Sequence, residues 1–187
     1  PRFTVPITDA SGEVVRMSQH LMVVAGIGLH VELSWTTAGD PNEQDASLSY
    51  DLWSAGSDVD LHFVASGGAL FGAKDTFFAN PNPEWGIFSP SDSPYLHVSD
   101  DGPESLRLDV PEQGVRYHVN AHYPDAAGQG AAWVTVRIYI YGVLRDQWTL
   151  SLEELDMWTS HTIAWPSGEV TRIGDGAPVI RTVMPLE

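Results

Sequence analysis

The chain has 187 residues, of which 43% are hydrophobic, and this composition suits one folded domain rather than a disordered chain. It carries 25 acidic residues against nine basic ones, a net charge of -16, which disfavours nucleic acid and anionic lipid as partners and favours cations. It has no cysteine, and no apolar run approaches the roughly 18 residues that a membrane helix needs.

The first 25 residues predict an N-terminal β-hairpin. Apolar residues alternate along residues 3–7 and 13–25, and Asp9-Ala10-Ser11-Gly12 between them is typical of a turn. A two-stranded sheet is marginally stable in water, so the apolar face of this hairpin needs a partner. Packing on the body of the same chain is favoured over strand addition to a neighbouring subunit, which would make the protein self-associate. The apolar face comprises Phe3, Val5, Ile7, Val15, Met17, Leu21 and Val23.

The next strands predict a main domain over residues 29–172. Residues 29–36 and 58–64 alternate in hydrophobicity, and two long polar segments, 37–57 and 66–104, read as loops. From residue 105 onward the strand runs are short and closely spaced, and only residues 150–155 suggest a turn of helix. These runs cover residues 105–110, 115–123, 132–141, 145–150 and 157–165.

This spacing predicts an all-β fold, an antiparallel β-sandwich of jelly-roll or immunoglobulin-like type with long loops. We expect residues 173–187 to form an extended tail at a sheet edge. The side chains expected inside the sandwich are Val59, Leu61, Phe63, Val119, Val136, Ile138 and Ile140.

A calcium site is predicted at one end of the sandwich. Asp58, Asp60 and His62 lie at alternate positions, so they share one face of a strand. Two carboxylates in such a row repel each other unless a cation neutralises them, and Ca²⁺ takes six to eight oxygen ligands. The alternative is a polar strand face that simply meets solvent.

A second acidic group strengthens the calcium interpretation. Asp100, Asp101 and Glu104 lie on a turn that contains Gly102 and Pro103, whose backbone carbonyls are further oxygen ligands. The alternative is an ordinary exposed acidic loop. The predicted ligands of the metal are therefore Asp58, Asp60, Asp100, Asp101 and Glu104.

Several stretches resemble a family of secreted bacterial modules. Gly56-Ser57-Asp58-Val59-Asp60-Leu61-His62-Phe63, Asn80-Pro81-Asn82-Pro83-Glu84-Trp85-Gly86 and Asp100-Asp101-Gly102-Pro103-Glu104 carry the resemblance. Similar "DVDLH … GPE" pairs occur in the YfaP-like, DUF2135 group, which is found in large surface proteins and lipoproteins, particularly of myxobacteria. The resemblance covers about residues 29–172, and the first 25 residues look like the last strands of a PKD or other Ig-like repeat. It implies a calcium-stabilised surface module.

The chain departs from this family at Thr76, where the relatives commonly carry cysteine. This difference removes a disulfide that the resemblance would imply. It leaves open what anchors the loop over residues 66–88.

The histidines predict a transition-metal site less well than a set of buried, hydrogen-bonded side chains. His118, Asn120 and His122 share a strand face, but His118 and His122 are about 13 Å apart on a strand and cannot chelate one zinc ion. A pairing of His62 with His122 across neighbouring strands remains open.

Catalysis is not expected, because the chain has no G-x-S-x-G motif, no H-E-x-x-H motif and no cysteine nucleophile. Loop aromatics are candidates for stacking on sugar rings, and the alternative is that they anchor their loops. The candidate ligand-binding residues are Trp53, Trp85, Tyr95, His62 and His122.

The sequence thus favours a non-catalytic extracellular module for adhesion, binding or surface assembly, stabilised by Ca²⁺, in a secreted or cell-surface protein. A start at Pro1 instead of Met fits a removed signal segment or a piece of a longer chain. The expected partner is a surface protein or a glycan. The alternatives are a carbohydrate-binding module and an accessory domain of a secreted hydrolase.

Overall fold

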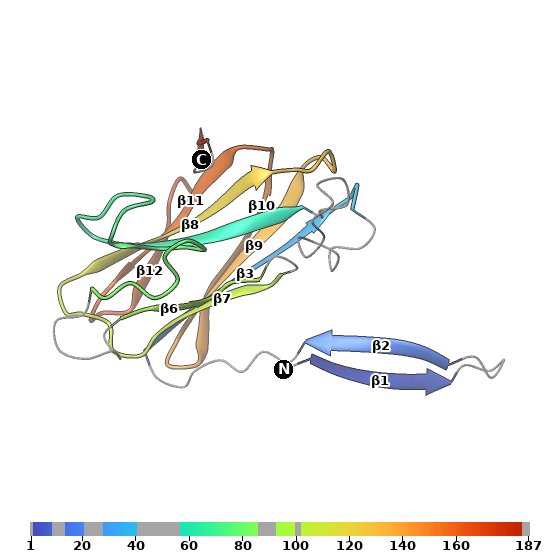
Figure 1. The fold of residues 1–187 in the computed structure, drawn as a ribbon. Coiled ribbons are helices and arrows are strands. Elements are labelled where there is room, and N and C mark those ends of the chain that lie inside the picture. Colours follow the sequence, from blue (N-terminus) through green and yellow to red (C-terminus); the bar gives the residue numbers. More distant parts are fainter. Residues whose placement is uncertain are drawn as a thin grey trace.

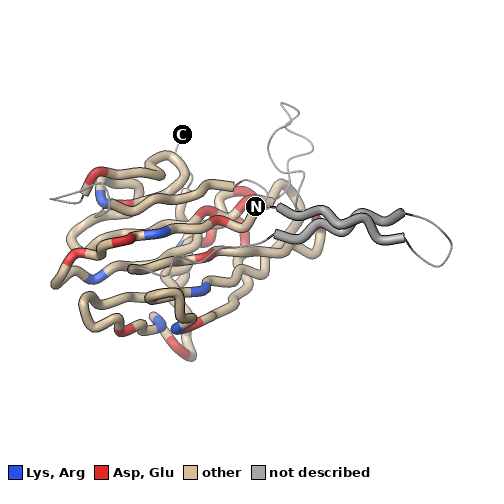
Figure 2. The backbone as a smooth tube through the Cα atoms, turned by 90° about the horizontal axis from the view of Figure 1, so that it is seen from below, with Lys and Arg blue, Asp and Glu red and all other residues tan. Residues whose placement is uncertain are grey.

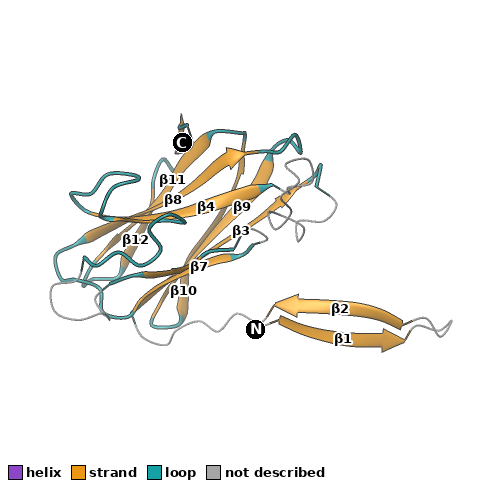
Figure 3. Cartoon of the chain, viewed as in Figure 1, coloured by secondary structure: helices purple, strands orange, loops and turns teal. Residues whose placement is uncertain are grey.

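The computed structural model describes residues 2–8, 14–20, 28–40, 57–85, 93–99 and 102–184, and for the first two ranges it describes the backbone alone. Every regular element in these ranges is a strand (Figure 3). β1 (Arg2–Thr8) and β2 (Val14–His20) pair in a two-stranded antiparallel sheet of their own, which confirms the hairpin. The side chains of the hairpin lie outside the described residues, so its packing partner stays a prediction.

The main body is an antiparallel β-sandwich (Figure 1), as the sequence predicts. One sheet has five strands in the order β10-β9-β3-β7-β6, and the other has six, ordered β12-β11-β8-β4-β5 with β13 also paired to β11. The strands are β3 (Leu29–Thr37), β4 (Asp58–Ala65), β5 (Asp75–Thr76), β6 (Tyr95–His97), β7 (Glu104–Leu108), β8 (Arg116–Asp125), β9 (Ala132–Ile140), β10 (Val143–Leu152), β11 (Asp156–Ala164), β12 (Glu169–Arg172) and β13 (Val179–Thr182).

Several boundaries differ from the predicted ones. The suggestion of a helical turn at residues 150–155 is wrong, because β10 continues to Leu152 and β11 begins at Asp156. The long loop over residues 66–104 contains the short strands β5 and β6, which are too brief to show a period of two. Within the predicted tail, residues 179–182 form β13, which pairs with β11 at the edge of the six-stranded sheet.

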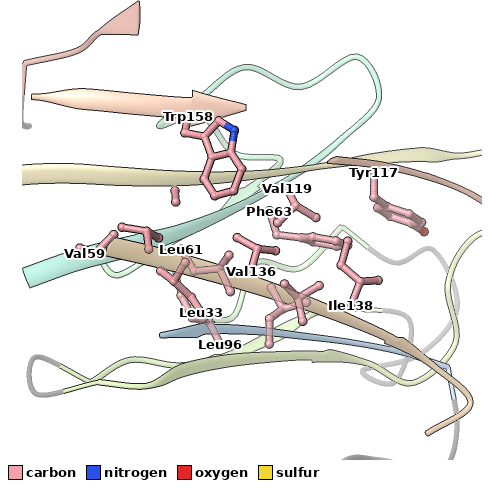
Figure 4. Packing of buried hydrophobic residues seen from close by; sticks show 14 of the residues in the cluster. Leu33, Val59, Leu61, Phe63, Leu96, Tyr117, Val119, Val136, Ile138 and Trp158 are labelled. Carbon is pink, nitrogen blue, oxygen red and sulfur yellow. The ribbon is translucent and has the colours of Figure 1, made fainter. Parts of the chain in front are cut away.

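The inner faces of the two sheets form the hydrophobic core (Figure 4). All seven side chains predicted to lie inside are at most 1% exposed, which confirms the alternation along β4, β8 and β9. Val59, Leu61 and Phe63 of β4 lie opposite Val136 and Ile138 of β9 in this core. Burying each such side chain stabilises the fold by roughly 1.5–3 kcal/mol.

The outer face of β4 is buried as well. Asp60, His62 and Val64 alternate with the core residues, yet each is 5% exposed or less. The chain that follows β4 returns over this face, and Phe77 and Met157 are buried outside the main core cluster. The alternative of a solvent-facing polar strand is therefore wrong.

An ionic cluster ties the edge strand β10 to the opposite sheet. The Arg172 guanidinium of β12 donates two hydrogen bonds to the Asp146 carboxylate, at 2.7 and 2.8 Å. His161 of β11 lies beside the same carboxylate, and burial lowers its pKa to about 4 against the opposing effect of Asp146. At neutral pH His161 is therefore uncharged, and the ion pair is the one between Asp146 and Arg172.

The chain enters the sandwich through a glycine that has no room for a side chain. Gly28 has a φ of +69°, and a Cβ atom there would lie 2.2 Å from the carbonyl oxygen of Leu108. The Gly28 carbonyl also accepts a hydrogen bond from the Tyr141 amide at 2.9 Å. Residue 28 is thus a fixed contact between β3, β7 and the β9–β10 turn.

We expect Gly28→Ala to lower the free energy of unfolding by about 3 kcal/mol or more, because both the positive φ and the backbone clash must be relieved. Gly114→Ala is the matched control, since Gly114 has a φ of +78° with open space around its Cβ position. It should cost only about 1 kcal/mol, the penalty for the left-handed conformation. Urea unfolding measures both, and equal losses would contradict the close approach at Gly28.

Candidate functional site

A buried carboxylate accepts a hydrogen bond from a backbone amide at one edge of β4. Glu104 is the first residue of β7 and is 1% exposed, and its Oε2 accepts a hydrogen bond of 2.6 Å from the Leu61 amide. β5 pairs with β4 only at Phe63 and Val64, so it does not reach this amide. A buried amide without an acceptor is costly, and Glu104 supplies the acceptor.

Glu104 lies within electrostatic reach of two of the predicted metal ligands. Burial raises the pKa of Glu104 well above its ordinary value, and the charge of Asp60 and then that of Asp58 raise this pKa further. The hydrogen bonds from the Leu61 and Ser99 amides lower it in part. This end of the sandwich is therefore under like-charge stress that a proton or a cation would relieve.

The remaining predicted ligands, Asp100 and Asp101, lie outside the described residues, although they directly precede Gly102. Within the described ranges no group of three His, Cys, Asp or Glu side chains is spaced to hold a metal ion. The convergence of all five carboxylates therefore stays a prediction. Figure 2 shows acidic positions spread over several strands and turns of the sandwich.

A hydrogen-bonded frame supports the same end. The Trp35 indole donates to the Ser57 carbonyl at 3.0 Å, and the Ser57 amide donates to Asp40 Oδ2 at 3.1 Å. Gly102, with a φ of +51°, lies against the Trp35 ring, which a Cβ atom would approach to 3.1 Å. The start of β4, the end of β3 and Gly102 are thus held together, and Asp40 is a member that the sequence pattern did not reveal.

His62 is part of a second cluster, on the outer face of the six-stranded sheet. Its Nδ1 lies 2.7 Å from Asp75 Oδ2, and both side chains are fully buried. Its ring stacks on Phe77 at 5.1 Å and meets Phe71 edge-on at 4.9 Å. The sequence pattern does not reveal Asp75, because this residue follows an irregular loop whose return onto β4 has no periodicity.

Asp75 also anchors the loop that covers this face. Its Oδ2 accepts a hydrogen bond of 2.7 Å from the Phe71 amide, and its carbonyl accepts one of 2.9 Å from Asn80. Thr76 stands fully buried at the position where the resembling family has cysteine. Hydrogen bonds therefore hold this loop where the resemblance would imply a disulfide.

The two histidines of β8 differ in burial and in their neighbours. His122 is 1% exposed, and its ring lies 5.9 Å from that of His62, so the two meet across neighbouring strands. Burial is the main cause that lowers the pKa of His122. The hydrogen bond with the Val183 carbonyl raises this pKa, and the neighbouring His62 lowers it by a smaller effect. His118 is only half-buried, while Asn120 accepts a hydrogen bond of 2.8 Å from Thr159.

The outer face of the five-stranded sheet presents a polar and aromatic surface. Arg137 donates hydrogen bonds to Gln147 on β10, to Glu32 on β3 and to Ser34 on β3. Two residues along the same face of β9, Thr135 bonds Thr149 at 2.8 Å. Trp133 follows at the end of this row and is 57% exposed. The alternation along β9 puts Trp133, Thr135 and Arg137 on the same outer face, so the sequence pattern could have predicted this row.

The loop aromatics proposed for sugar stacking have different surroundings. Trp85 packs against the core beside Phe63 and Tyr117, and its indole nitrogen is buried, so its position favours an anchoring role over a binding one. Tyr95 is 46% exposed with the Arg107 guanidinium over its ring. Trp53 lies outside the described residues.

Comparison of the chain with family models, with curated proteins and with solved structures yields no match. The resemblance to the YfaP-like group therefore stays a prediction. In the part of the chain that the structure describes, no helix is long and apolar enough to cross a membrane.

The like-charge stress at Glu104 predicts a pH dependence of stability. Because the pKa of Glu104 is raised in the folded state, the folded chain binds more protons than the unfolded one above pH 4.5. In the presence of a chelator, the free energy of unfolding should therefore fall as pH rises from about 4.5 through the raised pKa. Glu104→Gln should remove this share of the fall, whereas Glu169→Gln, on the exposed part of β12, should keep it. Parallel profiles for all three proteins, measured by urea unfolding, would contradict the assignment.

Proposed function

We propose that this chain is a non-catalytic binding module of a secreted or cell-surface protein, and that Ca²⁺ stabilises it at the Glu104 end of the sandwich. The observation that carries the calcium site is the burial of the Glu104 carboxylate beside the charges of Asp60 and Asp58. Three carboxylates within electrostatic reach of one another favour a hard cation with oxygen ligands, although these three alone are not spaced to hold one. A cation also removes the repulsion that would otherwise lower the stability of the fold.

The acidic turn is proposed to complete the site. Asp100 and Asp101 precede Gly102, and Gly102 lies against Trp35 at the same end of the sandwich as Ser57 and Asp58. Calcium bound there would link the turn to β4 and β7, and would hold the neighbouring loops in position for a partner.

A binding role suits this architecture. Loops at the ends of a rigid sandwich are common places for recognition, because the sheets position them precisely while the loop sequences vary. The carboxylates at this end hold backbone amides, as Glu104 and Asp40 both do. We therefore assign them to structure and to cation binding rather than to acid–base catalysis.

Saturating calcium should raise the melting temperature of the chelator-treated protein, because a ligand that binds only the folded state stabilises that state. At 100 times the dissociation constant the gain is about 2.7 kcal/mol. Asp60→Asn should remove most of this gain. Glu104→Gln should also remove the gain, yet in chelator it should be at least as stable as the wild type, since it loses like-charge repulsion and keeps an oxygen acceptor for Leu61.

Glu169→Gln is the control for general charge effects and should respond to calcium as the wild type does. The calcium assignment fails if the melting temperature of the wild type does not change between chelator and calcium. It also fails if Glu169→Gln loses as much of the gain as Asp60→Asn does.

A second candidate function, glycan binding, is supported by the outer face of the five-stranded sheet. Hydroxyl, amide and guanidinium groups form a row beside an exposed tryptophan, and the residues involved are Ser34, Thr135, Arg137, Gln147, Thr149 and Trp133. A sugar ring has a C–H face that can stack on Trp133 and hydroxyl groups that can hydrogen-bond to the polar row. This surface replaces the loop aromatics as the platform for the carbohydrate-binding alternative.

On a glycan array the wild-type protein should bind at least one class of polysaccharide, and Trp133→Ala should weaken that binding about fivefold or more, the loss of roughly 1 kcal/mol of stacking. Tyr141→Ala is the matched control, because Tyr141 is also 57% exposed but lies at the β9–β10 turn against Trp165. Equal losses for the two variants, or no retained glycan at all, would rule out this face as the platform.

A further inference from the structure

Two buried histidines on neighbouring strands each have one ring nitrogen without a hydrogen-bond partner among the described residues. The atoms are Nε2 of His62, on β4, and Nδ1 of His122, on β8. Their side chains are 0% and 1% exposed, so solvent does not satisfy these nitrogens. An unsatisfied buried polar atom costs about 1–3 kcal/mol, and two in adjacent rings require an explanation.

The partners of the other two ring nitrogens fix where the lone pairs are. His122 Nε2 lies 3.0 Å from the Val183 carbonyl oxygen, which can only accept, so this nitrogen carries the hydrogen. His62 Nδ1 lies 2.7 Å from Asp75 Oδ2, and the same oxygen accepts from the Phe71 amide, so it is an acceptor as well. In the neutral form of both rings, the unpartnered His62 Nε2 and His122 Nδ1 are therefore lone-pair nitrogens.

This arrangement has the form of an outer shell around metal-bound imidazoles. A histidine that ligates a metal generally donates its other N–H to a carboxylate or a backbone carbonyl, which holds the ring and raises its basicity. Asp75 has this position for His62, and the Val183 carbonyl has it for His122. Phe71 contacts both histidine rings and Phe77 contacts that of His62. The aromatic contacts alone therefore account for the packing of the two rings, without the Asp75 or Val183 oxygen.

The spacing of the rings suits one shared ion. A metal–nitrogen bond is about 2.0–2.1 Å long and a ring centroid lies about 1.2 Å behind its nitrogen, so two imidazoles on one ion have centroids roughly 5 to 6.5 Å apart. The centroids of His62 and His122 are 5.9 Å apart, with the ring planes at 65°. His118, four residues from His122 on the same strand, is too distant to join them.

The register of the sheet offers a third donor beside His122. Met157 on β11 is its cross-strand partner and is fully buried. Imidazole nitrogen suits zinc and copper, and a thioether adds a preference for Cu(I). The negative charge of Asp75, fully buried beside His62, offsets part of the charge of either ion.

We infer that His62 and His122 form a site for one late first-row transition-metal ion, held by His62 Nε2 and His122 Nδ1 and oriented by Asp75 and the Val183 carbonyl. The site is distinct from the calcium site in its chemistry, because it offers nitrogen donors where calcium takes oxygen. It would fasten the loop that carries Phe71 and Asp75, and the chain around Val183, onto the sheet.

The test uses the full chain in calcium-free buffer. Because both rings are buried, the protein is unfolded in guanidinium with a chelator, freed of the chelator, and refolded with one equivalent of Zn(II) or, under anaerobic reducing conditions, Cu(I). Metal content is measured after gel filtration, and affinity is measured by competition with a chromogenic chelator. We expect one equivalent of at least one of the two ions to stay bound.

His62→Gln and His122→Gln should each lower the affinity at least tenfold, whereas His118→Gln, on the same face of β8, should leave it unchanged. Asp75→Asn should weaken binding by about ten- to a hundredfold, as loss of an outer-shell partner does, and it tests the site if a histidine variant fails to fold. Met157→Leu should weaken the binding of Cu(I) and leave the binding of Zn(II) unchanged if the thioether is the third donor.

The inference is overturned if the wild type retains neither ion, as it would if a water molecule or a proton bridges the two nitrogens. It is equally overturned if His118→Gln loses the ion to the same extent as His122→Gln. Because calcium is absent throughout, neither result depends on the calcium site.

Discussion

The burial of β4 on both faces is the constraint on which the rest of the structure depends. Its inner residues, Val59, Leu61 and Phe63, enter the core, while Asp60 and His62 are covered by the chain that returns over the outer face. β5 lines its free edge for only two residues, so the remaining polar groups need partners from elsewhere. Each buried group without a partner would cost as much as a sizeable share of the fold's net stability.

Glu104 and Asp75 meet this constraint in two different ways. Glu104 accepts the Leu61 amide at the open edge of β4, but it brings a third negative charge beside Asp58 and Asp60. Asp75 pairs with His62 and organises its own loop through Phe71 and Asn80. The first arrangement is electrostatically incomplete without a cation or a proton, and the second leaves two imidazole lone pairs unmatched. These are the two places where we propose bound ions that would add stability to a domain without disulfides.

The sandwich separates one candidate site from the other two. The polar row with Trp133 lies on the outer face of the five-stranded sheet, whereas Asp60 of the proposed calcium site directly adjoins His62 along β4 and His122 across the sheet. All three sites rest on strands whose positions are set by the same core. The Asp146–Arg172 pair, which joins β10 to the opposite sheet, supports the edge of the polar face.

The amino-acid sequence alone determined the architecture, because side chains alternate with period two in a strand and the apolar half must be buried. That rule placed Val136 and Ile138 of β9 in the core and put Asp58 and Asp60 on one face of β4. It could not show that the outer face of β4 is buried, since an alternating strand looks the same whether a loop covers its polar side or water does. Only the tertiary structure brought Asp75 onto His62 and His122 beside it, because these contacts depend on how an irregular loop returns and on which strands become neighbours. Strand periodicity is local information, whereas the partner of a buried polar group is chosen by chain segments far away in the sequence.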